Sequence, residues 1–174
     1  KTARNATVIL SRTHTGLIKN LFEIEVPEIN ERIIEIMGIV REPNGRTKIA
    51  VKTNDRDVDA VGACVGMRGT RVQSIVQELR GEKIDIVEYS EDPELYIKNA
   101  LSPAKISRII KNSENNEMTI IVADDQMSLA IGKKGQNVRL AAKLVKQKIN
   151  IQSHSEASDS LDISGLLPTT KKSS

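Results

Sequence analysis

The sequence predicts an α+β fold made of two tandem copies of one unit, each with the element order α-β-β-α-α-β. Three observations support this prediction. A short glycine motif occurs twice, the same helical periodicity follows each motif, and a short alternating strand pattern follows each helix. Each copy should form a three-stranded sheet with its helices packed on one face.

The glycine motif has the form G-x-x-G. Gly66-Met67-Arg68-Gly69 recurs 66 positions later as Gly132-Lys133-Lys134-Gly135. After each motif, apolar residues follow at i, i+3, i+4 and i+7, which places them on one face of a helix. They are Val72, Ile75, Val76 and Leu79 in the first copy and Val138, Ala141, Ala142 and Val145 in the second.

In the first copy, a helix is expected to begin near Pro27, because proline is tolerated in the first helical turn. Two strands follow, joined by the turn signal of residues 42–45, Glu-Pro-Asn-Gly. A short helix over 57–65, opened by Asp57, leads to the glycine motif. After the second helix, Ile84 and Ile86 alternate with polar residues and predict the last strand.

The second copy repeats this order. Its first helix should begin at Pro93, with Asp92 as the N-cap. The hairpin turn falls in residues 112–116, and a short helix over 125–131, opened by Asp125, leads to the second glycine motif. Ile149 and Ile151 predict the final strand.

The two ends of the chain do not fit the repeat. Residues 6–10 indicate a lone strand and residues 15–22 a short helix, so we assign residues 1–22 to the end of a preceding domain plus a connector helix. The two units are then residues 23–90 and 91–152. Residues 153–174 are rich in Ser, Thr and Lys without periodicity, which predicts a disordered tail.

Composition excludes several classes of protein. Only three of the 174 residues are aromatic (Phe22, Tyr89 and Tyr96), so the core must be aliphatic and aromatic base-stacking platforms are excluded. The single cysteine, Cys64, rules out an internal disulfide, and two distant histidines cannot complete a zinc site. No apolar run is long enough for a membrane span. We therefore expect no cofactor, no metal and no membrane partner.

The net charge of +3 conceals an uneven distribution. Residues 23–90 hold 10 basic and 13 acidic residues, whereas residues 91–152 hold 10 basic and 7 acidic. No acid occurs between Asp125 and Glu156, a stretch that carries six cations. This local positive field should attract polyanions to the second copy. The six are Lys133, Lys134, Arg139, Lys143, Lys146 and Lys148.

A G-x-x-G turn between helices has a structural and a functional interpretation. Alone, it indicates a helix corner in which glycine supplies positive φ and close packing. Here it occurs twice in register, and its inner residues include Arg68, Lys133 and Lys134, which a purely structural corner does not need. Glycines let the chain approach a phosphodiester closely, and the following helix N-terminus favours an anion. We therefore favour a nucleic-acid backbone as the ligand.

Other functions remain as alternatives or fail on the residues present. A protein-interaction module, in which the acidic first copy contacts a partner and its turn is structural, stays open. An enzyme is not expected, because there is no G-x-x-x-x-G-K-[ST] loop and no histidine paired with a nucleophile. Asp124-Asp125 fits a strand end and N-cap better than a magnesium site. The stripe Arg139, Lys143 and Lys146 fits a solvated face and RNA attraction equally well.

The element order and the position of G-x-x-G resemble prokaryotic-type (type II) KH domains, and the tandem pair resembles the NusA family of bacterial transcription factors. The resemblance spans residues 7 to about 152. The segments that carry it are Ser11-Arg12-Thr13-His14, Glu25-Val26-Pro27-Glu28-Ile29, Arg41-Glu42-Pro43, Arg46 to Val51, Asp59 to Gly66, Gly81 to Ile86, Ala100 to Ala104 and Ser128 to Gly132.

This resemblance implies a single-stranded RNA-binding module of a cytoplasmic elongation, termination and antitermination factor. Its partners would be nascent RNA, other transcription factors, and RNA polymerase, the last mainly through regions absent from this chain. Residues 4–12 would end a preceding OB-fold domain. By the same resemblance, the RNA-contacting residues are Gly66, Met67, Arg68, Gly69, Thr70, Arg71, Gly132, Lys133, Lys134, Gly135, Gln136 and Arg139. The cationic stripe adds Lys143 as a candidate.

Two loop residues depart from the family pattern. Met67 stands where the family commonly has proline, so the first loop should be less rigid. Lys134 stands where many members have glutamate, which should strengthen attraction of a nucleic-acid backbone to the second loop.

Overall fold

A computed structural model describes residues 15–42 and 45–159, and the structural statements below concern those residues. The lone strand expected at residues 6–10 lies outside them, as do Ser11 to His14 of the family pattern. Two three-stranded sheets are present, one in each predicted copy.

The first unit contains α2 (Thr15–Glu25), α3 (Pro27–Asn30), β1 (Ile34–Glu42), β2 (Arg46–Thr53), α4 (Ala60–Val65), the 3-10 turn η1 (Met67–Gly69), α5 (Thr70–Glu78) and β3 (Lys83–Glu88). The sheet order is β1-β2-β3, with β1 antiparallel and β3 parallel to β2. The central strand is therefore β2, and β3 is an edge strand beside the helices.

The second unit repeats this plan. It contains α6 (Pro93–Ala100), β4 (Arg108–Asn112), β5 (Glu117–Val122), the 3-10 turn η2 (Asp124–Gln126), α7 (Met127–Ile131), the 3-10 turn η3 (Lys133–Gly135), α8 (Gln136–Val145) and β6 (Lys148–Ser153). Its order is β4-β5-β6, again with one antiparallel and one parallel pair. The predicted α+β class and repeated topology are confirmed.

The predicted cap of the first helix in the second unit is confirmed, whereas the predicted start of the short helix in the first unit is wrong. Asp92 caps α6 as expected, because its side chain accepts a hydrogen bond from the backbone N–H of Glu94. The short helix of the first unit begins at Ala60, not at Asp57. Asp57 instead donates its backbone N–H to the side chain of Asp55, which makes a local turn before the helix.

The boundary expected between residues 22 and 23 was wrong. It cuts through α2, whose Ile18 and Phe22 are fully buried in the core of the first unit. The helix expected at Pro27 is the single turn α3, and Val26 and Ile29 continue the same buried face. The segment assigned to a connector is therefore part of the first unit, because its apolar face packs on that unit's sheet.

The disordered tail expected from residue 153 was also wrong at its start. Strand β6 extends to Ser153, and residues 154–159 are helical. Ser155 donates its hydroxyl to the carboxylate of Asp124, and its backbone N–H donates to the same carboxylate. The tail therefore begins with a helical turn attached to the second unit, and residues 160–174 lie outside the described residues.

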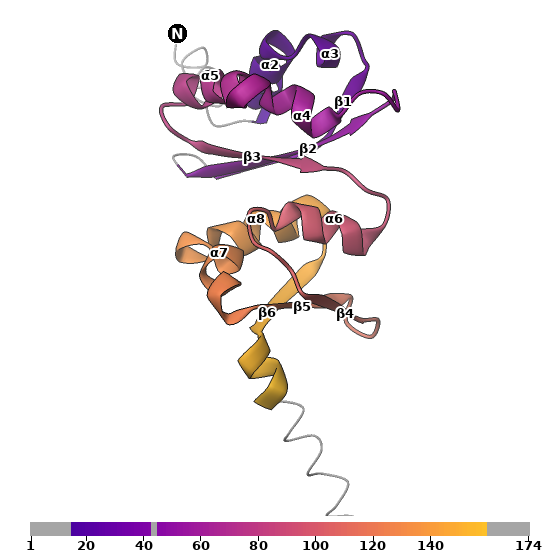
Figure 1. Cartoon of the computed structure of the whole chain (residues 1–174), viewed down its shortest axis with the longest axis vertical. Helices are drawn as coiled ribbons and strands as arrows, with labels where there is room; N and C mark the ends of the chain where they lie inside the picture. Colours follow the sequence, from indigo (N-terminus) through magenta and orange to yellow (C-terminus); the bar gives the residue numbers. More distant parts are fainter. Residues whose placement is uncertain (1–14, 43–44, 160–174) are drawn as a thin grey trace, which may run out of the picture.

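Helical and sheet layers alternate down the long axis of the molecule (Figure 1). Helices α2, α4 and α5 cover one face of the first sheet, and α6 and α8 lie against its other face. One core fills the first unit. The second core includes Ala50 and Val87 of the first sheet together with Ile97, Leu101 and Leu144 of the second unit. The two units thus share one of their cores.

The shared core also contains a buried charge. Lys48, on the central strand β2, has a fully buried side chain whose ammonium group lies 2.8 Å from the Asp85 carboxylate. The same Nζ donates to the backbone carbonyl of Ser102 in the second unit, at 3.1 Å. Burial lowers the pKa of Lys48, and Asp85 opposes that shift. Lys48 is therefore a polar connection between the units.

The described helices include none with the length and apolar character needed to cross a membrane.

Candidate nucleic-acid interface

The two G-x-x-G loops have nearly the same backbone conformation. Gly66 and Gly69 have φ of 78° and 75°, and Gly132 and Gly135 have φ of 79° and 74°. Between the glycines, Arg68 and Lys134 both have φ of 56°, the left-handed region. Both loops therefore present their third residue in a conformation that side-chain-bearing residues rarely adopt.

The first glycine of each loop is required by close packing as well as by its φ. A Cβ on Gly66 would lie 2.9 Å from the backbone nitrogen of Arg71, and one on Gly132 would lie 2.7 Å from that of Asn137. Without Cβ atoms, the loop folds back onto the first turn of the helix that follows. This close return brings the loop and the helix N-terminus to the same point.

Each loop leads directly into the N-terminus of an amphipathic helix. Helices α5 and α8 begin after Gly69 and Gly135, and no side chain caps either helix start. The exposed residues around these helix ends are Met67, Arg68, Thr70, Lys133 and Lys134. An uncapped helix N-terminus with adjacent cations attracts an anionic group such as a phosphate.

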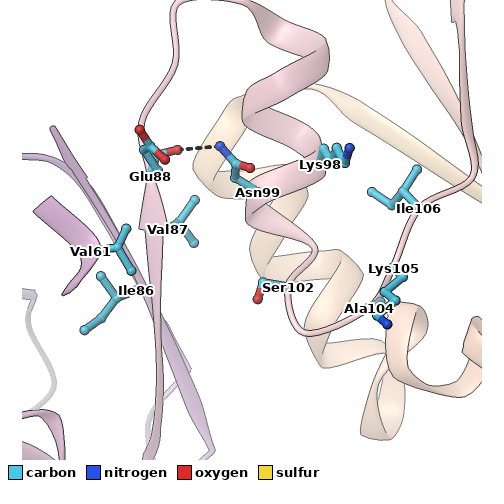
Figure 2. Close-up of a pocket in the computed structure, with 10 residues that line it drawn as sticks. All are labelled: Val61, Ile86, Val87, Glu88, Lys98, Asn99, Ser102, Ala104, Lys105 and Ile106. Carbon is cyan, nitrogen blue, oxygen red and sulfur yellow. Dashed lines mark hydrogen bonds between the residues drawn. The ribbon is translucent and has the colours of Figure 1, made fainter. Parts of the chain in front are cut away.

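A pocket is lined by residues of both units. Val61 of α4 and Ile86 of the edge strand β3 both line a pocket of about 570 Å³ (Figure 2). The remaining lining residues come from the end of β3 and from the second unit: Val87, Glu88, Lys98, Asn99, Ser102, Ala104, Lys105 and Ile106. The apolar side and the two lysines suit a nucleotide, whose base and phosphate have these opposite preferences.

The junction that forms this pocket is held by a side-chain hydrogen bond. Asn99 of α6 donates its Nδ2 to the backbone carbonyl of Glu88 at 3.1 Å, as Figure 2 shows. This contact fixes the start of the second unit against the edge strand of the first.

Arg71, a predicted RNA contact, has its guanidinium engaged within the first unit. Its Nη1 donates to the Glu28 carboxylate at 2.8 Å and to the carbonyl of Ala63 at 2.7 Å. The equivalent residue of the second unit is Asn137, which is fully buried. Its Nδ2 donates to the carbonyls of Leu101, Leu129 and Ala130. Both side chains therefore tie the loop-following helix to the helix that precedes the loop.

Gln136 and Arg139, also predicted RNA contacts, are bound to the first unit. Glu42, at the end of β1, accepts hydrogen bonds from Arg139 Nε and, at 2.9 Å, from Arg139 Nη2. It also accepts one from Gln136 Nε2 at 3.0 Å. The hydrogen bond from Arg139 is the main cause that lowers the pKa of Glu42 to about 2. Glu42 is therefore ionised throughout the neutral range.

Lys143 and Lys146 continue the cationic stripe along α8, and both are exposed. Lys143 lies near enough to Glu42 to lower the pKa of that carboxyl. At the C-terminal end of α8, Lys143, Lys146 and Lys148 line an open depression together with Asn115 and Asn116 of the β4–β5 turn. The depression includes no residue of the second loop, and Arg139, which lies between the loop and Lys143 in the sequence, is paired with Glu42.

Sequence reasoning found both loops but missed the residues that hold them. Glu42 gave no signal, because it falls in a turn pattern 94 residues before its partner Gln136. Asn137 could have been found, since the 66-residue repeat aligns it with Arg71. The single cysteine, Cys64, is fully buried, and burial raises the pKa of its thiol to about 12.

Among residues 15–42 and 45–159, no group of three or more His, Cys, Asp or Glu side chains is arranged to hold a metal ion.

Comparison with known families gives two matches that divide the chain as its repeat does. Residues 12–89 match the NusA-like first KH domain, and residues 93–159 match the NusA-like second KH domain. The first match includes α2, and the second includes the helical turn after β6. Both agree with the packing of these segments in the structure.

Curated relatives and a solved structure are similar to most of the chain. The Transcription termination/antitermination protein NusA of Bacillus subtilis (strain 168) is 55% identical over 90% of the chain. The protein of the same name from Halalkalibacterium halodurans is 54% identical over 91%. The chain spans 42% of the length of each. The crystal structure of APE1850 matches with a TM-score of 0.52 and 26% identity, covering 74% of this chain and 95% of that one.

Proposed function

Because the chain belongs to the NusA family as a tandem pair of its KH domains, we propose that it binds single-stranded RNA with both G-x-x-G loops. The observation that carries this proposal is the duplicated loop geometry. Two loops with the same glycine conformations each place exposed side chains beside an uncapped helix N-terminus. A phosphodiester backbone, which repeats its charge at every nucleotide, suits a site that is itself repeated.

The bases would lie in the groove between α4 and β3 in the first domain, and between α7 and β6 in the second. This arrangement needs no aromatic platform, which agrees with the three aromatic residues of the whole chain. Direct contacts would come from the loops, Gly66 to Gly69 and Gly132 to Gly135, from Thr70, and from Lys143. Arg71 would support its loop from within the protein, because its guanidinium is bound to Glu28 and Ala63.

The names of the relatives support a wider role for the whole protein. They are called transcription termination/antitermination proteins, and this chain spans 42% of their length. We propose that the RNA bound here is nascent transcript and that the whole protein acts in the cytoplasm on elongation, termination and antitermination. Contacts with RNA polymerase would come mainly from regions outside this chain, and other transcription factors could bind the same assembly.

The experiment replaces each loop with Gly-Asp-Asp-Gly. One variant carries Met67→Asp and Arg68→Asp, and the other carries Lys133→Asp and Lys134→Asp. Fluorescence anisotropy with an A-rich single-stranded RNA of about 8–12 nucleotides measures affinity, since two KH units hold about four nucleotides each. We expect each variant to weaken binding by about tenfold or more, because each adds repulsion at a phosphate site.

A matched control separates local contacts from net charge. Arg56→Asp with Lys111→Asp makes the same change in charge as the second loop variant, at exposed positions outside the loops. We expect this control to bind more tightly than either loop variant. If both loop variants bind RNA as the wild type does while remaining folded by circular dichroism, the loops are structural. The protein-interaction alternative would then replace RNA binding.

A further inference from the structure

The second G-x-x-G loop is held in place by contacts with the first domain. Glu42, the last residue of β1, binds the guanidinium of Arg139 through both carboxylate oxygens. Its Oε2 also accepts from Gln136, the first residue of α8. Gly45, the last residue of the hairpin turn that follows Glu42, lies so close to Gln136 that a Cβ there would meet its Nε2 at 2.1 Å. The end of the β1–β2 hairpin thus packs against the N-terminus of α8.

Arg139 carries this contact into the loop itself. Its third donor, Nη1, binds the backbone carbonyl of Lys134 at 3.1 Å. Lys134 is the residue that the loop holds in the left-handed conformation, with φ of 56°. One guanidinium therefore connects a carboxylate of the first domain to the backbone of the second loop. The guanidinium is rigid and planar, and two of its N–H groups bind the carboxylate side by side. This bidentate contact therefore fixes the orientation of the Arg139 side chain as well as its distance from Glu42.

The first loop has no equivalent brace among the described residues. The position that corresponds to Arg139 is Gln73, which is exposed, and the position that corresponds to Gln136 is Thr70, also exposed. The brace is thus a feature of how the two domains meet, not of the repeated unit. The brace occurs at the second loop, whose two lysines would attract an RNA backbone most strongly.

We propose that Glu42 and Arg139 form a strut through which the first domain positions the second RNA-binding loop, with Arg139 as a positioning residue and not a phosphate contact. This inference rests on the proposed RNA-binding function. In the free protein, the bidentate edge of Arg139 is occupied, so a phosphate could use it only by displacing Glu42. Lys133, Lys134 and Lys143 remain exposed for the RNA backbone.

The test is a charge exchange across the strut. Glu42→Arg and Arg139→Glu each break the pair, and the double variant restores opposite charges in reversed order. The first readout needs no RNA: backbone amide chemical shifts of residues 133–136 in NMR spectra. We expect each single variant to shift these signals, and the double variant to bring them back toward the wild type.

The second readout is affinity and its salt dependence, measured with the A-rich RNA. Each single variant should bind several-fold more weakly, and the double variant should return to within about twofold, with the wild-type salt slope. Arg139→Lys keeps the charge but loses the fork, so it should also weaken binding. Gln73→Glu is the control, because it places a negative charge, as Arg139→Glu does, at the equivalent position of the unbraced first loop. Adding Glu42→Arg should not restore the RNA affinity of this variant.

Other outcomes would overturn the strut. If the double variant binds as weakly as Arg139→Glu and its salt slope is lower by about 0.7, Arg139 contacts a phosphate directly. If Glu42→Gln strengthens binding, Glu42 competes with RNA and does not position the loop. The NMR readout keeps the two proposals apart. A wild-type protein that binds no RNA refutes the proposed function, whereas unchanged loop signals in the single variants refute the strut.

Discussion

At the scale of single residues, the two loops are built from the same glycines but held by different side chains. Arg71 and Asn137 occupy equivalent positions, and both donate to a carbonyl in the last turn of the preceding helix, Ala63 in one domain and Leu129 in the other. A partly exposed guanidinium serves the first domain and a buried amide the second. The backbone arrangement is therefore conserved between the copies, while the chemistry that holds it differs.

Gly132 should be much less tolerant of substitution than a glycine with the same sign of φ in open space. Gly132→Ala would place a Cβ 2.7 Å from the backbone nitrogen of Asn137. Gly81→Ala is the matched control, because Gly81 also has positive φ but nothing lies within 4 Å of its added Cβ. We expect Gly81→Ala to cost about 1 kcal/mol of unfolding free energy and Gly132→Ala clearly more. Equal losses in urea titrations would contradict this reading of the loop.

A pH titration should reveal the Glu42 contact. Arg139 lowers the pKa of Glu42 in the folded protein to about 2, from an ordinary value of 4.5. A lowered folded-state pKa gives stability that is fully present above 4.5 and is lost as the pH falls toward 2. We expect the wild type to be more stable than Glu42→Gln at pH 6, and the difference to shrink toward pH 2. A difference that does not change over this range would argue against the contact in solution.

At the scale of elements, the strongest sequence signals marked the most regular parts. Alternation in residues 84–86 and 149–151 predicted strands that the structure contains, and the spacing after each glycine motif predicted α5 and α8. Short helices were harder to predict. The start of α4 depends on a turn at Asp55, and α3 is a single turn whose burial depends on Ile29 packing on the sheet. Neither effect is visible in periodicity.

The end of α8 carries a strained residue that glycine should relieve. Lys146, its C-cap, has φ of 57°, and the backbone N–H of Gln147 closes the helix by donating to Ala142. Lys146→Gly should raise the free energy of unfolding by about 1 kcal/mol, because glycine adopts the left-handed conformation without cost. Lys143→Gly, which removes the same charge from inside α8, should lower it by about 1 kcal/mol. Thermal unfolding of both variants checks the opposite signs.

At the scale of the whole molecule, the domain interface was the part that the sequence could not provide. Both faces of the first sheet are buried. In the sequence, the only sign of this burial is the apolar run Ile49-Ala50-Val51. Nothing local pairs Lys48 with Ser102 or Glu42 with Arg139, because these contacts depend on how the two domains pack. The repeat predicted two copies of a fold. The packing between the copies determines which polar side chains are engaged in hydrogen bonds.

The interface should be sensitive to volume at Gly38. This residue of β1 faces α8, and a Cβ on it would lie 3.1 Å from Leu144 Cδ1. Gly38→Ala should therefore destabilise the protein, typically by about 1–3 kcal/mol for an overpacked contact. Leu144→Ala makes room, so the double variant should lose less than the sum of the two single losses. Strict additivity in a double-mutant cycle would show that the two residues do not meet.

The shared core has a consequence for the proposed binding of one RNA by both loops. Because Ala50 and Val87 of the first sheet pack with Ile97 and Leu101, the loops are held on one body and not on a flexible tether. Once one loop binds, the local concentration of RNA at the other is set by the nucleotides between the two contacts. Such avidity can reach on the order of 10²–10⁴ when the spacer fits, and it disappears when the spacer is too short to span the sites. The protein would then select RNAs by the spacing of two short elements as well as by their bases.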